Sequence, residues 1–329
     1  MSLFPTIYST LDPQALAGLV TTRYGLPGAS GQLLVRGVGD TYLIKSAGQR
    51  FILRVYRGSH RSLSQINAEI EMLAALKKAS VSVSYPLADR QGNYIQQLEA
   101  AEGIRPAVLF TYAPGMTVNK LNDAQLKNLG RAMAAFHTVS ASVKLKAERW
   151  EYNLTTIFDE PLQRLQPAFV SIPAEYDWWL KAVDQAKSAL TQLPLSDFSI
   201  GYCQYDFLPK NFHFEGDAIT LFDFDFLGHG WLVNDIMTFW THLCLDVHFG
   251  RMTQAEADRS FQLLLTEYRQ LRSLSEAELK AIPYLSLGWW CYYMGFHATH
   301  DQFIALIQPS QLSIRTGVIR KLAEKYSPL

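Results

Sequence analysis

Three oxygen-bearing side chains flank a short apolar hairpin in the second half of the chain. Asp206 lies five positions before Asn211, and Asp223 follows two apolar runs joined by a Glu-Gly-Asp turn at residues 215–217. Two such runs predict a β-hairpin. Closing the hairpin brings Asn211 near Asp223, with Asp206 on the loop that leads in. Carboxylates at the end of a hydrophobic hairpin are costly without a cation, and oxygen ligands favour Mg²⁺, so the spacing predicts a divalent-cation site.

This segment resembles the catalytic segment of the kinase-like phosphotransferases, which include aminoglycoside phosphotransferases, choline kinases and homoserine kinases. The Asp-x-x-x-x-Asn spacing matches the catalytic loop of kinases in general. The resemblance implies that Asp206 accepts the proton of a substrate hydroxyl, that Asn211 binds Mg²⁺, and that Asp223 binds Mg²⁺ and bridges the phosphates of ATP. Asp225 gives the Asp-x-Asp variant of small-molecule kinases, and Asp235 is expected to support the loop.

One position departs from the family pattern. The family usually has His-Gly-Asp where this chain has Gln204-Tyr205-Asp206. The histidine commonly braces the catalytic loop by a hydrogen bond, and a glutamine amide can also donate and accept. We therefore expect the site to persist. The substitution leaves open a pseudokinase that binds nucleotide or a partner without turnover.

Residues 1–113 are expected to form a small nucleotide-binding lobe that combines one antiparallel sheet with one main helix. The patterning predicts helices at 12–25 and 62–78 and strands at 33–35, 41–44, 51–56, 93–98 and 107–112. Gly37 and Gly39 lie between the first two strands, where a kinase carries its phosphate-covering loop. Taken alone, two glycines in a hairpin are more often an ordinary turn.

The third predicted strand carries Ile52 and Arg54 on one face, because side chains alternate along a strand. The resemblance implies that Ile52 lies over the adenine, that Arg54 binds the phosphates, and that Glu69 of the following helix pairs with Arg54. Arg54 could instead only extend into solvent. Glu71 lies about 200° around the helix from Glu69, so a solvated role is expected for it.

The stretch that contains Phe110 and Tyr112 resembles the kinase hinge, whose backbone would hydrogen-bond the adenine edge. After the expected boundary at Pro114-Gly115, residues 114–329 are predicted to form a larger helical lobe for catalysis and substrate binding. The patterning indicates helices near 122–139, 174–192, 232–247, 253–270, 275–298 and 311–326, with a single β interruption at 202–226. The predicted fold class is α+β, a bilobal protein-kinase-like fold.

The 122–139 helix contains a run at 129–137 that resembles a helix of the same family. His137 at its end is assigned no chemistry. Residues 284–296 are unusually aromatic, and the simplest interpretation is helix packing. A sharper hypothesis is that some of these rings, with Asp246 or Asp301, line a pocket for a cationic amino-alcohol through cation–π contacts. The rings are those of Tyr284, Trp289, Trp290, Tyr292, Tyr293 and Phe296.

Composition limits the functional classes. Lys and Arg number 30, as do Asp and Glu, and this balance argues against nucleic-acid binding and against a polybasic membrane surface. The hydrophobic fraction of 48% is too high for a disordered chain. Three scattered cysteines predict neither a zinc site nor disulfides. A signal-peptide pattern and a long apolar span are absent from the sequence, so a cytoplasmic protein is expected.

The resemblance therefore implies an enzyme that transfers the γ-phosphate of ATP, with Mg²⁺, to a hydroxyl group of a small molecule. Amino-alcohols, homoserine, sugars and aminoglycosides are all candidate acceptors, and residues 268–278 resemble homoserine-kinase-like sequences. The pseudokinase is one rival. A divergent protein kinase is the other, although neither an Ala-Pro-Glu motif nor a recognisable activation-loop phosphosite is found.

Overall fold

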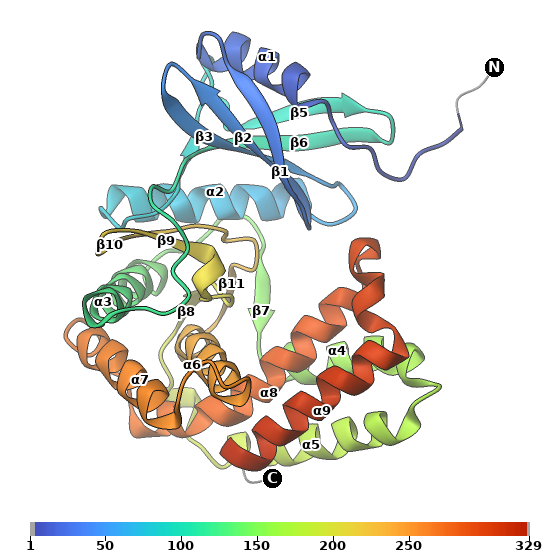
Figure 1. Cartoon of the computed structure of the whole chain (residues 1–329), viewed down its shortest axis with the longest axis vertical. Helices are drawn as coiled ribbons and strands as arrows, with labels where there is room; N and C mark the ends of the chain where they lie inside the picture. The colour runs from blue at the N-terminus through green and yellow to red at the C-terminus, as the bar shows by residue number, and fades with distance from the viewer. Residues whose placement is uncertain (1–3, 328–329) are drawn as a thin grey trace. The chain divides into compact units, whose positions relative to one another are not determined.

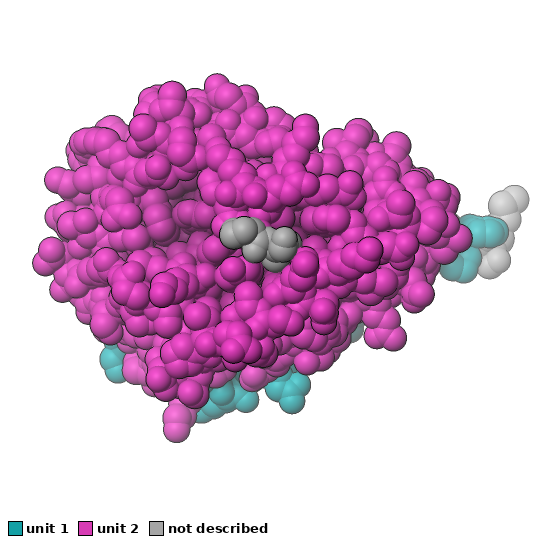
Figure 2. Space-filling view, turned by 90° about the horizontal axis from the view of Figure 1, so that it is seen from below, with its two compact units in different colours: residues 1–114, 145–148 teal, residues 115–144, 149–329 magenta. Residues whose placement is uncertain are grey.

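The computed structural model describes residues 4–327, and the chain divides into two compact units. Unit 1 contains the chain up to Pro114 together with Leu145–Glu148, and unit 2 contains Gly115–Lys144 and the chain from Arg149 onward. The two units are coloured separately in Figure 2. Each unit contains both helices and strands, in agreement with the predicted α+β class.

Unit 1 is built around an antiparallel sheet with the order β1-β2-β3-β6-β4, in which β5 also pairs with β6. Its strands are β1 (Ser30–Arg36), β2 (Gly39–Ser46), β3 (Gln49–Tyr56), β4 (Pro86–Leu87), β5 (Ile95–Ala100) and β6 (Gly103–Thr111). Helix α1 (Pro13–Tyr24) and helix α2 (Leu63–Lys78) lie on opposite sides of this sheet (Figure 1). The predicted strands and both predicted helices are present. Only the two-residue β4 was not predicted.

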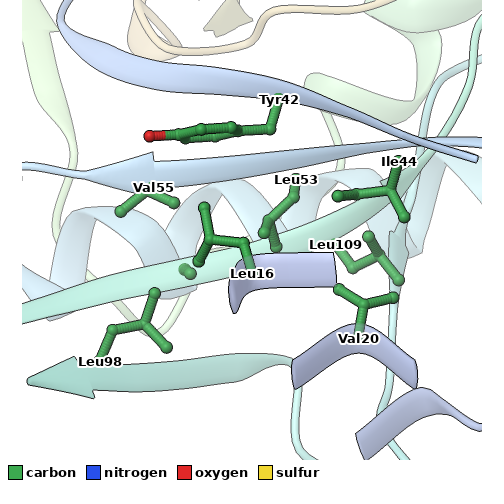
Figure 3. Packing of buried hydrophobic residues seen from close by; sticks show 9 residues of the cluster. Leu16, Val20, Tyr42, Ile44, Leu53, Val55, Leu98 and Leu109 are labelled. Carbon is green, nitrogen blue, oxygen red and sulfur yellow. The ribbon is translucent and has the colours of Figure 1, made fainter. Parts of the chain in front are cut away.

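The α1 face of the sheet holds the core of unit 1. Figure 3 shows Leu16 and Val20 of α1 against the alternating inward side chains of the central strands, which include Tyr42, Ile44, Leu53, Val55 and Leu109. These side chains alternate because successive residues of a strand point to opposite faces. Helix α1 begins where the Asp12 carboxylate accepts a hydrogen bond from the Ala15 N–H at 2.7 Å, as a capping residue should.

Residues 145–148 belong to unit 1 because two side chains of α2 hold their backbone. The Glu71 carboxylate accepts the Lys146 N–H at 2.8 Å, and the Ser64 hydroxyl accepts the Glu148 N–H at 3.2 Å. Glu71 is partly exposed and this hydrogen bond lies at the surface, so the contact adds to the solvated role expected for Glu71. Helical periodicity alone does not reveal a backbone partner that lies 75 positions later.

Unit 2 is mainly helical, and its longer helices follow the predicted ranges to within about two residues. They are α3 (Asp123–Ser140), α5 (Pro173–Thr191), α6 (Val233–His248), α7 (Gln254–Tyr268), α8 (Glu276–Ala298) and α9 (Pro309–Tyr326). Helices α3, α7 and α8 each begin with a capping box, which satisfies two otherwise unbonded N–H groups and explains the sharp starts. Helix α8 packs against α4 (Glu160–Leu165), α5, α6 and α9 (Figure 1).

The strands of unit 2 form two small sheets. One is the predicted hairpin of β9 (Phe212–Glu215) and β10 (Ala218–Leu221). The other has the order β7-β11-β8, from β7 (Trp150–Tyr152), β8 (Ile200–Cys203) and β11 (Gly228–Trp231). The expectation of a single β interruption was therefore wrong. Strands of three or four residues carry no measurable periodicity.

The glycines of β11 allow this second sheet to form. A Cβ atom on Gly228 would lie 2.5 Å from the Tyr152 ring, and one on Gly230 would lie 2.8 Å from the Tyr152 Cβ. Glycine inside a strand commonly marks such a close approach.

Within residues 4–327, none of the helices is long and apolar enough to cross a membrane. Cys203, Cys244 and Cys291 are all buried free thiols.

Candidate active site

The β9–β10 hairpin brings Asn211 and Asp223 together, as the spacing predicts. Phe212 pairs with Leu221 in the hairpin register, and just outside it the Phe222 N–H donates to the Asn211 carbonyl oxygen at 3.0 Å. The hairpin therefore holds the backbone of Asn211 beside that of Phe222, one residue before Asp223. This contact confirms the predicted juxtaposition, and what the two side chains bind is taken up under the proposed function.

The Asp206 carboxylate is buried and is oriented through one of its two oxygens. Its Oδ2 accepts a hydrogen bond from Asn211 Nδ2 at 2.7 Å and an ion pair from Lys210 Nζ at 2.9 Å. Its Oδ1 is also buried and has no hydrogen-bond partner in the described part of the chain. Burial raises the pKa of Asp206, and the charge of Lys210 opposes that effect. The result is a carboxylate held through Oδ2, whose Oδ1 has no hydrogen-bond partner among residues 4–327.

Two residues of this region have left-handed backbone, which non-glycine residues seldom adopt. Tyr205 has φ +61° and Asp223 has φ +60°. Three contacts hold Tyr205. Its N–H donates to Asp235 Oδ1 at 2.6 Å, its carbonyl accepts from Trp289 Nε1 at 3.1 Å, and its ring stacks on Tyr152 at 3.7 Å. Together these contacts fix the backbone of Tyr205 and so help to orient the side chain of the next residue, Asp206.

A buried chain of hydrogen bonds lies beneath residues 204–211, which we call the 204–211 loop. Asp235 Oδ2 accepts the Gln204 N–H at 2.9 Å and lies 3.0 Å from His137 Nε2. His137 Nδ1 in turn lies 2.8 Å from the Tyr268 hydroxyl. Burial lowers the pKa of His137 although Asp235 acts against the effect. A neutral ring therefore donates from Nε2 to Asp235 and accepts from Tyr268.

The support predicted for Asp235 is confirmed by these bonds. His137, to which the sequence assigned no chemistry, is part of the same support. Gln204 braces the other side of the loop, because its Nε2 donates to the carbonyl oxygens of Phe222 at 2.8 Å and Asp223 at 3.3 Å. The glutamine thus links the loop to the backbone at Asp223, which is the kind of bracing expected of the family histidine.

In unit 1, the predicted ion pair between Arg54 and Glu69 is present. Arg54 Nη1 lies 3.6 Å from Glu69 Oε1, and the two side chains are 12% and 2% exposed. The Tyr56 hydroxyl donates to Glu69 Oε2 at 3.2 Å. The guanidinium is therefore held by a buried carboxylate on α2 and does not simply extend from the strand into water.

The other residues of unit 1 that are predicted to contact the nucleotide lie on or next to strands of the sheet. Ile52 of β3 pairs with Phe110 of β6, and Tyr112 follows the end of β6. Gly37 and Gly39 form the tight turn between β1 and β2, in which the Gly37 N–H donates to the Gly39 carbonyl at 3.0 Å. Their contacts with a nucleotide remain predictions.

Helix α8 supplies two residues at the 204–211 loop, Trp289 and Tyr293. Trp289 is buried and donates to the Tyr205 carbonyl, so it packs beneath the loop and cannot line an open cation pocket. Asp246, proposed as an acidic member of that pocket, is held by Arg251 at 2.6 Å. These contacts argue against Trp289 and Asp246 as members of the predicted cation pocket.

Lys210 is not among the site residues predicted from the sequence, and Tyr293 is predicted only as one of the aromatic rings of the cation pocket. Lys210 Nζ lies 3.2 Å from the Tyr293 hydroxyl. Burial, followed by the negative charge of Asp206, raises the pKa of Tyr293. Lys210 could have been found, because it lies inside the Asp-x-x-x-x-Asn spacing and directly precedes Asn211. Its contact with Tyr293 could not, because it crosses more than eighty positions.

Residues 32–274 match the model of the phosphotransferase enzyme family, APH. The match covers well over half of the chain, which therefore belongs to this family, as the sequence motifs predict. An uncharacterized protein of Deinococcus radiodurans is 32% identical over 301 residues, which cover 90% of this chain and 84% of that protein. A homoserine kinase of Phenylobacterium zucineum is 26% identical over 296 residues, which cover 86% of this chain and 83% of that enzyme.

Solved structures show the same fold. An amicoumacin kinase in complex with AMP-PNP, Ca²⁺ and Ami aligns with a TM-score of 0.72 at 20% identity, over 96% of this chain and 94% of that chain. The protein-kinase-like fold predicted from the sequence is confirmed. The chain is a small-molecule phosphotransferase, a kinase whose acceptor is a hydroxyl group.

Proposed function

We propose that the chain transfers the γ-phosphate of ATP to a small-molecule alcohol in a reaction that requires Mg²⁺. The observation that carries the proposal is the Asp206 carboxylate, which Asn211 and Lys210 hold through Oδ2 while Oδ1 has no partner in residues 4–327. Such an oxygen suits a hydroxyl group that must be oriented and deprotonated. The amicoumacin kinase with AMP-PNP, a close analogue of ATP, supports the choice of nucleotide.

The donor set fits a hard divalent cation. Asn211 commits its Nδ2 to Asp206, and its Oδ1 accepts no hydrogen bond from the described residues. Asp223 is exposed and follows Phe222, which pairs with Asn211 at the open end of the hairpin, opposite the turn. Mg²⁺ prefers a few protein oxygens and completes its shell with water and phosphate. When bound there, the ion would neutralise charge on the transferring phosphoryl group.

The chain's own residues would then perform four tasks. Asp206 Oδ1 orients the acceptor hydroxyl and takes its proton. Lys210 keeps this buried carboxylate ionised and supplies positive charge beside it. Arg54, held by Glu69, binds nucleotide phosphate. The buried network under the 204–211 loop keeps the base in place, so that catalysis comes mainly from positioning and charge neutralisation.

Gln204 bears on the choice between an active enzyme and a pseudokinase. Its side chain makes two hydrogen bonds to the backbone at residues 222 and 223. The loop therefore has a brace at the position of the usual histidine, and this supports turnover.

The test is transfer of labelled phosphate from ATP to a panel of small alcohols, with and without Mg²⁺. Wild type should form a phosphate ester only with the metal, and Asp206→Ala should abolish turnover while it retains nucleotide binding. Asp217→Asn, in the exposed hairpin turn, is the matched control and should keep wild-type activity. Nucleotide binding without transfer to any alcohol would favour the pseudokinase. Transfer to polypeptide would favour the protein kinase.

A further inference from the structure

A row of polar side chains leads away from Asp206 along α8 and ends on α9. Lys210 Nζ lies 2.9 Å from Asp206 Oδ2 and 3.2 Å from the Tyr293 hydroxyl. Tyr293 and His297 are one helical turn apart on α8, with ring centroids 5.6 Å apart. His297 Nδ1 then lies 3.2 Å from Arg315 Nη1. The row therefore joins the proposed base, through Lys210, Tyr293 and His297, to the guanidinium of Arg315.

Among residues 4–327, Arg315 has no carboxylate partner. In the described part of the chain its polar contacts are His297 Nδ1 and the Leu306 carbonyl oxygen at 3.3 Å. The guanidinium is only partly exposed. Arg54, by contrast, is paired with Glu69, and the exposed Arg259 is paired with Asp123. A partly desolvated guanidinium without a counter-ion is ready to bind an anion, for which its planar fork is well suited.

The imidazole beside Arg315 does not add a competing charge. Burial, followed by the charge of Arg315, lowers the pKa of His297 to about 3. The ring is therefore neutral at pH 7, and its Nδ1 accepts a hydrogen bond from Arg315. The Nε2–H remains as a second donor for a ligand held by the guanidinium.

We propose that the acceptor alcohol carries an acidic group, a carboxylate or a phosphate-like dianion, which Arg315 and His297 bind while the hydroxyl lies at Asp206. This inference rests on the proposed function and specifies its substrate class. One turn of α8 rises about 5.4 Å, so the acidic group should be several bonds from the hydroxyl.

The chemistry of transfer is unchanged by the acidic group. The acceptor oxygen forms the new bond to the γ-phosphorus, and the bond between that phosphorus and the β–γ bridging oxygen breaks. ADP leaves, and the hydroxyl proton passes to Asp206. The acidic group fixes the direction of the acceptor and is not consumed.

A cationic amino-alcohol fits this row poorly. It would meet Lys210 and Arg315, and the carboxylate in the row, Asp206, is already engaged by Lys210 and Asn211. Like charges in such a partly buried site oppose binding. The row therefore selects acidic over basic acceptors.

The experiment uses four alcohols of matched length on the full chain with Mg-ATP. They are 4-hydroxybutyrate, 4-hydroxybutylphosphonate, 1,4-butanediol and 4-amino-1-butanol. Wild type should show the lowest KM for one of the two acids, and which acid it prefers distinguishes a carboxylate from a dianion site. Arg315→Met should raise that KM about 10- to 100-fold, as expected for loss of charge-assisted hydrogen bonds, and should change the KM for the diol far less. Arg315→Lys should restore part of the loss.

Arg320→Met is the control, because it removes an arginine from the same helix that lies over the Trp178 ring at 5.2 Å. It should leave every KM as in wild type. Calorimetric titration of both acids into the AMP-PNP complex of wild type and Arg315→Met gives a second readout that needs no turnover. Preference for the amino-alcohol, equal effects of Arg315→Met on all acceptors, or no acid binding to a wild type that binds nucleotide would overturn the inference alone. Failure to bind nucleotide would overturn the proposed function itself.

Discussion

The two sides of the 204–211 loop differ in how completely their polar groups are bonded. On the buried side, Asp235 accepts the N–H groups of Gln204 and Tyr205 and a hydrogen bond from His137. On the other side, Asp206 Oδ1 has no partner within residues 4–327, and Asp223 is exposed in a left-handed conformation. The bonded side of the loop supplies rigidity, whereas Asp206 Oδ1 is kept for a ligand. Substitutions on the two sides should therefore have opposite signatures.

The largest expected effect is on catalysis. Asp206→Asn should lower kcat by about 10²–10⁴-fold, the usual contribution of a positioned base. Its thermal stability should match or exceed that of wild type, because burial raises the pKa of this carboxyl and the amide carries no charge. Steady-state kinetics and thermal melting on the same samples test both parts. A variant with wild-type kcat would show that Asp206 is not the base.

On the buried side, the loss should fall on stability. Asp235→Ala leaves two loop N–H groups and His137 without their acceptor, which should cost about 3–5 kcal/mol of unfolding free energy. Chemical denaturation measures it, with the exposed Asp217→Asn as a control that should change little. A stably folded Asp235→Ala protein with reduced kcat would place this residue on the functional side.

The next prediction concerns Tyr205, where a substitution has two opposing effects on the free energy of unfolding. Tyr205→Gly should relieve about 1–2 kcal/mol of left-handed strain, but it removes a buried ring stacked on Tyr152, a loss of about 3–5 kcal/mol. We therefore expect a net loss of about 2–3 kcal/mol by denaturant titration. A more stable glycine variant would mean that the strain, and not the ring packing, dominates at this position.

Part of the fold and of the candidate site could be predicted from the sequence. The order and spacing of Asp206, Asn211 and Asp223 predict the hairpin and the open end at which they meet, because strand pairing is local there. Capping residues and apolar periodicity likewise predict the long helices. The partners of Lys210 and Arg315 could not be predicted, because Tyr293 and His297 reach them through the packing of α8, which leaves no local pattern in the chain.

The β7–β11–β8 sheet shows the same limit. Its strands are too short for periodicity, and the glycines of β11 are typical of a turn. Tyr152 is distant in sequence but close in space, and its close approach explains why glycines occupy positions 228 and 230 of this strand.

The smallest predicted effect is the pH dependence of stability. Burial lowers the pKa of His297 to about 3 and lowers that of His137. The unfolded chain therefore binds more protons below about pH 6.5, so stability is complete above that pH and falls as the pH decreases toward the folded-state pKa. Each such histidine should contribute up to about 1.4 kcal/mol per pH unit below 6.5. Denaturation between pH 7 and 5 should show a shallower acid slope for His297→Asn than for wild type. An unchanged slope would contradict this assignment.

The most direct test of the central claim is calorimetric titration of AMP-PNP into wild type and Asp223→Ala, each with and without Mg²⁺. We expect binding to wild type that strengthens with Mg²⁺, and at least a tenfold loss of that metal-dependent gain in Asp223→Ala. Wild type that takes up no nucleotide under either condition, or that binds it equally well without the metal, would contradict the account.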